Sequence, residues 1–101
     1  MNVSTSTRDT VATIRLQGRF DFSVHREFRE AVKSAVSASE VREIEIDLSA
    51  VTYMDSSALG MLLLSRENAA TERKTVILVR PAENVRQVLE VATFHKLFTI
   101  R

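Results

Sequence analysis

The amino-acid sequence predicts an α/β domain with a mixed sheet of four to five strands and helices packed mainly on one face. Three observations lead to this fold class. Segments with strand alternation and segments with helical spacing follow one another in the order β β α β α β α, with a possible last strand. Residues 43–48 alternate acidic and apolar side chains, so one face of the sheet is expected to meet water. Residues 75–79 form an apolar run of strand length, which is typical of a central strand.

The composition is that of a globular domain and argues against several functions. A chain of 101 residues, 45% apolar and 27% charged, is expected to form one domain over residues 1–101. Its net charge of +1 favours neither nucleic-acid binding nor attraction to a membrane surface. The absence of cysteine excludes disulfides, thiolate zinc sites and thiol nucleophiles. With no signal-peptide pattern and no apolar run approaching about 18 residues, we expect a cytoplasmic protein without membrane insertion.

The first part of the chain is predicted to form a hairpin followed by a helix. The hairpin joins residues 3–7 to residues 10–18, and Gly18 is expected to end its second arm. Apolar residues alternate with polar ones in that arm: Ala12, Ile14 and Leu16. The helix is expected to start at Ser23 as its N-cap and to end within residues 37–40. Its apolar residues recur at helical spacing: Val24, Phe28, Ala31, Val32, Ala35 and Val36.

The middle of the chain contains the clearest predicted strand. It should direct alternate residues into the core: Ile44, Ile46 and Leu48. The residues between them should face water: Glu43, Glu45 and Asp47. A short connection at 49–54 is expected to lead to a second helix at about 57–70. Its inner stripe is Leu59, Leu62 and Leu63, widened by Met61 and Leu64.

After the strand at 75–79, a third helix is predicted, and Pro81 is expected to open it. Its apolar residues are Val85, Val88, Leu89 and Ala92. Apolar residues between 94 and 100 are expected to pack against the domain, with a possible short edge strand. Because strand–helix–strand units cross over right-handed, the parallel part of the sheet should lie around residues 43–48 and 75–79.

The sequence D-S-S-A-L-G at 55–60 lies where the second helix is expected to begin. One interpretation is capping, in which Asp55 or a serine accepts N–H groups of the first turn and stabilises the helix by roughly 0.5–2 kcal/mol. The other is regulatory, because a helix N-terminus attracts anions, and a phosphate there adds about −1.5 to −2 charges without unravelling the helix. The two interpretations are compatible. We expect Asp55, Ser56 and Ser57 to be exposed above a buried inner stripe.

Enzymatic and cofactor functions find little support in the sequence. A catalytic serine needs an oriented base, but there is no G-x-S-x-G pattern and the histidines are His25 and His95. These two histidines, without cysteine or H-E-x-x-H spacing, do not indicate a metal site. With Gly18 and Gly60 as the two glycines, a glycine-rich phosphate loop is excluded. We therefore expect no catalytic residues, no cofactor and no metal.

Three stretches of the chain resemble the STAS domain. They are LQGRFDF at 16–22, IEIDLSAVTYMDSSALGMLLL at 44–64 and VRQVLEVATFHKLFTI at 85–100, in one colinear order. Within that superfamily the sequence looks most like the bacterial anti-sigma factor antagonists. The resemblance implies a non-enzymatic regulator whose unphosphorylated form sequesters an anti-sigma factor and so frees a sigma factor. It also implies two partners: an anti-sigma factor that is a serine kinase, and a serine phosphatase that removes the phosphate.

Carried over residue by residue, the family motif makes Ser56 the phosphoacceptor. Asp55 is then the adjacent carboxylate, Ser57 the supporting hydroxyl and Gly60 the motif glycine. The resemblance implies that these residues and Ala58 contact the partner. Ala58 departs from the family pattern, since many members have glycine there; alanine favours a helix by about 1 kcal/mol and should stiffen the turn. T-E-R-K at 71–74 is a second departure, replacing a frequent glycine-containing turn.

An alternative function stays open at this point. STAS subunits that support ATP-driven, phospholipid-trafficking transporters also present this helix to a partner, without a necessary phosphate cycle. The intact D-S-S sequence at 55–57 favours the antagonist. Nucleotide binding by the domain itself is a third function within the superfamily, and no motif here supports it.

Overall fold

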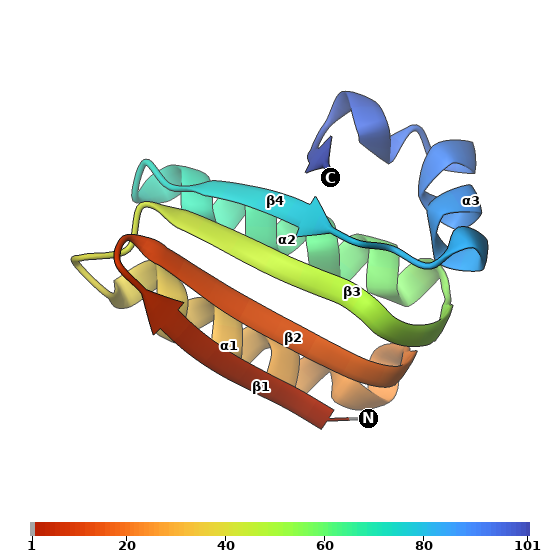
Figure 1. Cartoon of the computed structure of the whole chain (residues 1–101), viewed down its shortest axis with the longest axis horizontal. Coiled ribbons are helices and arrows are strands. Elements are labelled where there is room, and N and C mark those ends of the chain that lie inside the picture. Colours follow the sequence, from red (N-terminus) through yellow and green to blue (C-terminus); the bar gives the residue numbers. More distant parts are fainter. Residues whose placement is uncertain (1) are drawn as a thin grey trace.

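The computed structural model describes residues 2–101, which fold into a five-stranded sheet and three α-helices (Figure 1). The strands are β1 (Asn2–Arg8), β2 (Val11–Phe20), β3 (Glu43–Met54), β4 (Thr75–Val79) and β5 (Thr99–Ile100). The helices are α1 (His25–Ser37), α2 (Ser56–Thr71) and α3 (Glu83–Val91). Short 3-10 turns, Phe22–Val24 and Phe94–Lys96, precede α1 and β5. The predicted order of elements is confirmed.

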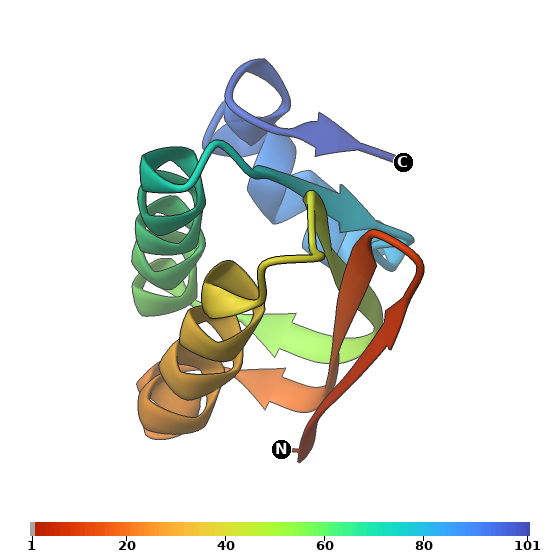
Figure 2. The same ribbon diagram turned by 90° about the vertical axis from the view of Figure 1, so that its left-hand side faces the viewer.

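The strands lie in the order β1-β2-β3-β4-β5, so neighbours along the chain are also neighbours in the sheet. β1 and β2 form an antiparallel hairpin, whereas β2, β3, β4 and β5 run parallel. Parallel neighbours need crossovers, and a consistent right-handed crossover places successive helices on the same side. α1 and α2 accordingly lie side by side behind the sheet in Figure 1 and on one of its faces in Figure 2. This arrangement confirms the predicted fold class.

The hydrophobic core lies between the helices and the covered face of the sheet. Ile14, Ile46 and Leu78 are in register across β2, β3 and β4, and all three are fully buried. α1 adds Phe28, whose ring centroid lies 5.2 Å from that of Phe20 at the end of β2. The helix α3 adds Val85 and Leu89. The alternation that predicted the strands therefore corresponds to burial on one face.

The two long parallel strands run further than the sequence indicated. β2 continues past Gly18 to Phe20, and its pairing with β3 shifts register between Gly18 and Arg19. Gly18 has a φ of 100°, a conformation that favours glycine, so it marks an irregularity within the strand instead of its end. The predicted connection at 49–54 is the last part of β3, paired with β2 as far as Met54. Both strands thereby reach the end of the sheet where α1 and α2 begin.

Two helix starts also differ from the prediction. Asp21, and not Ser23, caps the turn that leads into α1, because its carboxylate accepts a hydrogen bond from the Ser23 N–H at 3.0 Å. Ser23 itself lies inside that 3-10 turn. Pro81 precedes α3 by two residues, and the helix begins at Glu83 because the cap residue Ala82 still has an extended backbone.

Asp47 is buried, although the sequence predicted that it faces water. It shares the uncovered face of the sheet with Glu43 and Glu45, which are half-buried. Arg80, directly after β4, donates to Asp47 Oδ2 at 3.0 Å, and the Ser49 N–H donates to Oδ1 at 2.9 Å. Burial alone would raise the pKa of Asp47, but the hydrogen bonds from Ser49 and the guanidinium of Arg80 hold that pKa below its ordinary value.

We expect Asp47 to make the fold sensitive to acid. Its pKa is lower in the folded chain, so its stabilisation is complete above the unfolded value of about 3.9 and is lost as the pH falls through the folded value. The difference in unfolding free energy between wild type and Asp47→Asn should therefore be constant above about pH 5 and shrink below about pH 4. Denaturant titrations across this range measure it. If the difference in unfolding free energy grew as the pH fell, the pKa of Asp47 would not be lowered in the folded chain.

The end of α2 positions a lysine against the end of α1. Arg73 adopts a left-handed φ of 59°, and its N–H donates to the Ala70 carbonyl at 3.1 Å. The Lys74 N–H donates to the Ala69 carbonyl at 2.9 Å, so the usual helix-ending motif forms with arginine where glycine is common. The Lys74 ammonium then donates to carbonyls at the end of α1: Val36 at 2.6 Å, Ala38 at 2.5 Å and Ala35 at 3.3 Å.

Lys74→Met should lower the free energy of unfolding by about 1–3 kcal/mol, because it leaves the carbonyls at the end of α1 without their charged donor. Methionine keeps the apolar stem and removes the ammonium. The control is Lys33→Met at an exposed position of α1, which should change stability by less than about 0.5 kcal/mol. Chemical denaturation compares the two variants with wild type, and equal effects would refute the role of Lys74.

Candidate functional site

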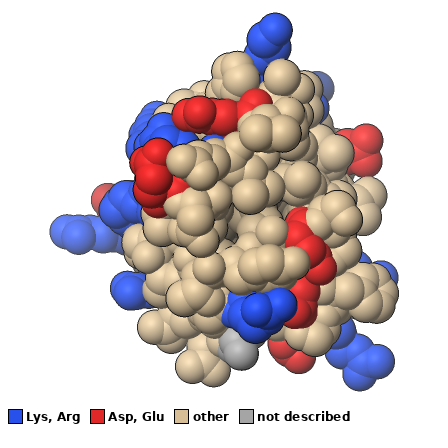
Figure 3. Space-filling model, turned by 90° about the vertical axis from the view of Figure 1, so that its right-hand side faces the viewer, with Lys and Arg blue, Asp and Glu red and all other residues tan. Residues whose placement is uncertain are grey.

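The candidate site lies at the end of the sheet where β2 and β3 finish and α1 and α2 begin. Figure 3 shows the molecule from this end. Uncharged side chains make up most of this face, and acidic and basic side chains are both present on it. It is thus a mixed surface and not a patch of one sign.

Asp55 caps α2 and organises its first turn. Its backbone is still extended, with φ −107° and ψ −177°, because β3 ends only one residue earlier. One carboxylate oxygen, Oδ1, accepts the Ala58 N–H at 3.0 Å and the Ser57 hydroxyl at 2.6 Å. The capping interpretation is confirmed, with Asp55 as the acceptor.

Ser56 is the first residue of α2 and is exposed as predicted. The predicted exposure is wrong for its neighbours Asp55 and Ser57, which are half-buried where their side chains bond to each other in the cap. No side-chain hydrogen bond of Ser56 is found among residues 2–101. Ala58 is fully buried, so its side chain packs against the core beneath the turn. The residue next to the cap is therefore exposed, and its neighbours hold the turn in place.

The apolar residues of α2 are less uniformly buried than the sequence suggested. Leu62 is fully buried, whereas Leu59 and Leu63 are half-buried against the core. Leu64 is 59% exposed and does not widen the inner face, although Met61 does. The start of α2 thus presents both a polar turn and some apolar surface.

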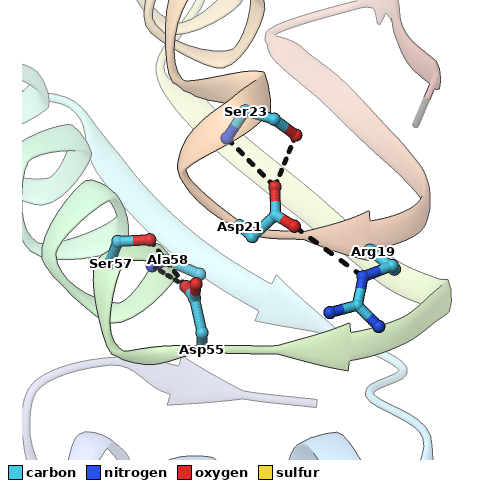
Figure 4. A network of polar contacts seen from close by, with 6 residues as sticks. All are labelled: Arg19, Asp21, Ser23, Asp55, Ser57 and Ala58. Atoms are coloured by element: carbon cyan, nitrogen blue, oxygen red, sulfur yellow. Dashed lines mark hydrogen bonds and ion pairs between the residues drawn. The ribbon is translucent and has the colours of Figure 1, made fainter.

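A second turn of the same construction lies beside the first. Phe20 and Met54 are in register at the ends of β2 and β3, and the Asp55 N–H donates to the Phe20 carbonyl at 3.4 Å. Asp21 therefore sits next to Asp55, and each carboxylate accepts a hydrogen bond from the hydroxyl of the serine two residues later (Figure 4). Asp21 also accepts the Ser23 N–H. The hydrogen bond from the Ser23 hydroxyl lowers the pKa of Asp21 most, and the bond from the Ser23 N–H lowers it further. The repeated Asp-x-Ser pattern at 21–23 was the signal that could have revealed this turn.

Aromatic side chains flank the two turns. The Arg19 guanidinium lies 4.1 Å from the ring centroid of Tyr53 and within 3.8 Å of the Asp21 carboxylate. Phe22, the residue that corresponds to Ser56 in the second turn, is 65% exposed and stacks on His25 at 4.7 Å. Exposed aromatic residues are frequent anchors of protein–protein contacts.

A shallow apolar groove borders α2 on the side of α3. The Asn84 side chain donates to the Thr52 carbonyl at 3.0 Å, which fixes the start of α3 beside the end of β3. The groove is lined by Leu59, Asn84, Gln87, Val88, Val91 and Ala92. Val91 is 88% exposed, so the apolar surface on this side is open to a partner.

Residues 2–101 give no support to a metal site or a membrane span. No group of three or more His, Asp or Glu side chains in that range is placed to hold a metal ion. No helix within it is both long and apolar enough to cross a membrane.

The family model for STAS domains, described as "Mlab, STAS domain", matches residues 3–99. The chain belongs to the STAS-domain family. A STAS-domain containing protein of Pseudomonas aeruginosa is 44% identical to this STAS domain over 88 residues, covering 87% of the chain and 85% of that relative. The anti-sigma F factor antagonist of Lysinibacillus sphaericus is 33% identical over 85 residues, covering 83% of the chain and 71% of that relative.

The fold of this STAS domain is that of the anti-sigma factor antagonists. The structure of one of them, SpoIIAA in its unphosphorylated form, matches with a TM-score of 0.83 at 21% identity, covering 99% of this chain and 88% of SpoIIAA. At that identity the likeness concerns the fold alone. The resemblance found in the sequence is confirmed for the family and for the fold.

Proposed function

We propose that this STAS domain is an anti-sigma factor antagonist switched by phosphorylation of Ser56. In the cytoplasm its unphosphorylated form binds an anti-sigma factor and releases a sigma factor, and the phosphorylated form does not bind. The anti-sigma factor is also the serine kinase, and a serine phosphatase reverses the modification. The observation that carries the proposal is the exposed Ser56 side chain at the first residue of α2. The antagonist relative and the shared fold support it.

The hydrogen bonds of the turn favour Ser56 over Ser57 as the phosphoacceptor. Ser57 is half-buried and its hydroxyl donates to Asp55 at 2.6 Å, so phosphorylation there would remove one of the two hydrogen bonds that Asp55 accepts and place a second anion against it. Phosphorylation of Ser56 breaks none of the cap bonds, which join Asp55 to Ser57 and Ala58. A phosphate at this position also lies near the positive end of the α2 dipole. The domain can therefore carry the phosphate without refolding.

The switch acts at the surface where the partner packs. A phosphate adds about −1.5 to −2 charges directly beside the Asp55 carboxylate. A partner that covers the turn must remove water from both groups, and charges left unpaired at an interface weaken binding strongly. Exposed apolar side chains on either side, Phe22 and Val91, supply the area on which such a partner packs.

The proposal is tested by binding and phosphorylation assays with purified kinase-type anti-sigma factors that are encoded in the same genome as this STAS domain. We expect one of them to bind the STAS domain and, with ATP and Mg²⁺, to add one phosphate that mass spectrometry locates on Ser56. Ser56→Ala should bind and take up no phosphate, and the matched control Ser57→Ala should still be modified at Ser56. Phosphate on Ser57, or no binding to any of these proteins, would refute the proposal. Binding to a transporter ATPase without phosphate uptake would favour the alternative function.

A further inference from the structure

A second groove lies between α1 and α2, which run side by side on one face of the sheet (Figure 2). Each helix contributes four residues at the spacing i, i+3, i+4 and i+7, which follows one helix face over two turns. They are His25, Phe28, Arg29 and Val32 of α1, and Met61, Leu64, Ser65 and Asn68 of α2. This α1–α2 groove has a volume of about 240 Å³ and follows the helices for about 10 Å.

The floor of the α1–α2 groove is apolar. Phe28, Val32 and Met61 are buried in it, and the exposed Leu64 lies on its rim. Ser65 is also buried, but its hydroxyl donates to the Leu62 carbonyl of its own helix at 2.6 Å, so this polar group already has its partner. A small side chain at position 65 leaves open a space that a larger one would fill. The groove therefore suits a slender apolar ligand.

Positive charge borders the α1–α2 groove on the side of α1. Arg29 lines the groove, is exposed, and forms no ion pair within residues 2–101. The residues three and four positions from it on α1 include Arg26 and Lys33 and no acidic residue. No carboxylate of the described chain lines the groove. The charge around Arg29 thus favours an occupant with an anionic group.

A more polar hollow continues the α1–α2 groove toward the ends of the two helices. It shares Arg29 and Asn68 with the groove and is also lined by Lys33, Thr71 and the acidic residue Glu30. An apolar channel is thereby followed by two positive charges and several hydrogen-bond donors. Such a sequence of surfaces matches an amphiphile that has an unbranched tail and a negatively charged head.

We propose that the α1–α2 groove binds the anion of a medium-chain fatty acid, with its alkyl chain between the helices and its carboxylate at Arg29. Arginine can hold a carboxylate through two parallel N–H bonds. A helix with its side chains is about 10–12 Å across, whereas packed helices lie about 8–10 Å apart, so a partner helix would rest on the groove and an alkyl chain can enter it. This site goes beyond the proposed function, because Ser56 does not line it.

Octanoate, used below the concentration at which it forms micelles, tests the proposal. In two-dimensional NMR spectra of the isotope-labelled domain, we expect saturable shifts for the amides of residues 25–33 and 61–68. Arg29→Glu should weaken binding tenfold or more, which corresponds to about 1.4 kcal/mol. The matched control is Arg8→Glu, the same change at an exposed residue of β1 that lines neither the groove nor the hollow, and it should bind as wild type does.

Two further comparisons test the shape and the charge of the site. Ser65→Leu should fill the groove and abolish binding, and Arg29→Glu still decides the question if Ser65→Leu does not fold. Octanol, with the same chain and no charge, should bind more weakly than octanoate.

The inference is overturned if octanoate gives no saturable shifts, if the shifts lie elsewhere, or if octanol binds equally well. Equal weakening by Arg8→Glu and Arg29→Glu would also overturn it. So would a dimer of the free domain that Arg29→Glu dissociates, because a second copy of the chain would then cover the groove.

Discussion

Ser56→Asp is expected to weaken binding to the anti-sigma factor tenfold or more while the fold stays intact. A carboxylate in the first turn of a helix is neutral or favourable, by about 0.3–1 kcal/mol, and Ser56 makes no side-chain hydrogen bond within residues 2–101 that the change would break. At the interface the new carboxylate lies beside Asp55. Leaving one such charge desolvated and unpaired costs about 2–5 kcal/mol, and each tenfold in affinity corresponds to about 1.4 kcal/mol.

Calorimetry with the cognate anti-sigma factor measures this effect, and thermal unfolding verifies the fold. Ser56→Ala is the matched control, because it removes the hydroxyl without adding charge and should bind as wild type does. Aspartate carries one charge where phosphoserine carries nearly two, so the phosphorylated protein should bind more weakly still. If Ser56→Asp binds as tightly as wild type, the electrostatic part of the mechanism is wrong.

Ile46→Ala should have the largest effect on stability among the substitutions considered, about 2–5 kcal/mol. Ile46 is fully buried on β3 between Ile14 of β2 and Leu78 of β4, so truncation leaves a cavity with rigid walls on both sides. Chemical denaturation of wild type and variant measures the loss of unfolding free energy. An unchanged slope of that free energy against denaturant concentration would show that the unfolded state is the same.

The control for Ile46→Ala is the neighbouring residue on the opposite face. Glu45 is half-buried, and its carboxylate accepts a long hydrogen bond, 3.4 Å, from the Thr13 hydroxyl. Glu45→Ala should change the free energy of unfolding by less than about 0.5 kcal/mol. Equal losses at the two positions would contradict a sheet with one face in the core.

Much of the fold and the position of the candidate site could be predicted because they depend on local patterns. The alternation in 44–48 reports which side chains face the core, and every strand and helix was placed in the correct order. The polar residues 55–57, followed by an apolar run, located the start of α2 and the exposed Ser56. A small polar residue at a helix start has the same capping chemistry in any fold.

Other features depend on residues that meet only when the sheet forms. Residues 49–54 show no alternation, and they are a strand because β2 pairs with them. Asp47 is buried because Arg80 reaches it from 33 positions away, and Lys74 reaches the end of α1 over 36 to 39 positions. These contacts follow from the parallel register, which no single segment encodes.

The surroundings of the site were decided in the same way. The sequence by itself predicted a helix cap among residues 55–57 and an exposed Ser56, and the structure decided that Asp55 is the cap. Only the tertiary structure placed the Asp21 turn beside them and the start of α3 beside the end of β3, because parallel strands bring the starts of successive helices to one end of the sheet. The α1–α2 groove is likewise a property of the folded chain, since its lining residues come from two helices that are far apart in the sequence.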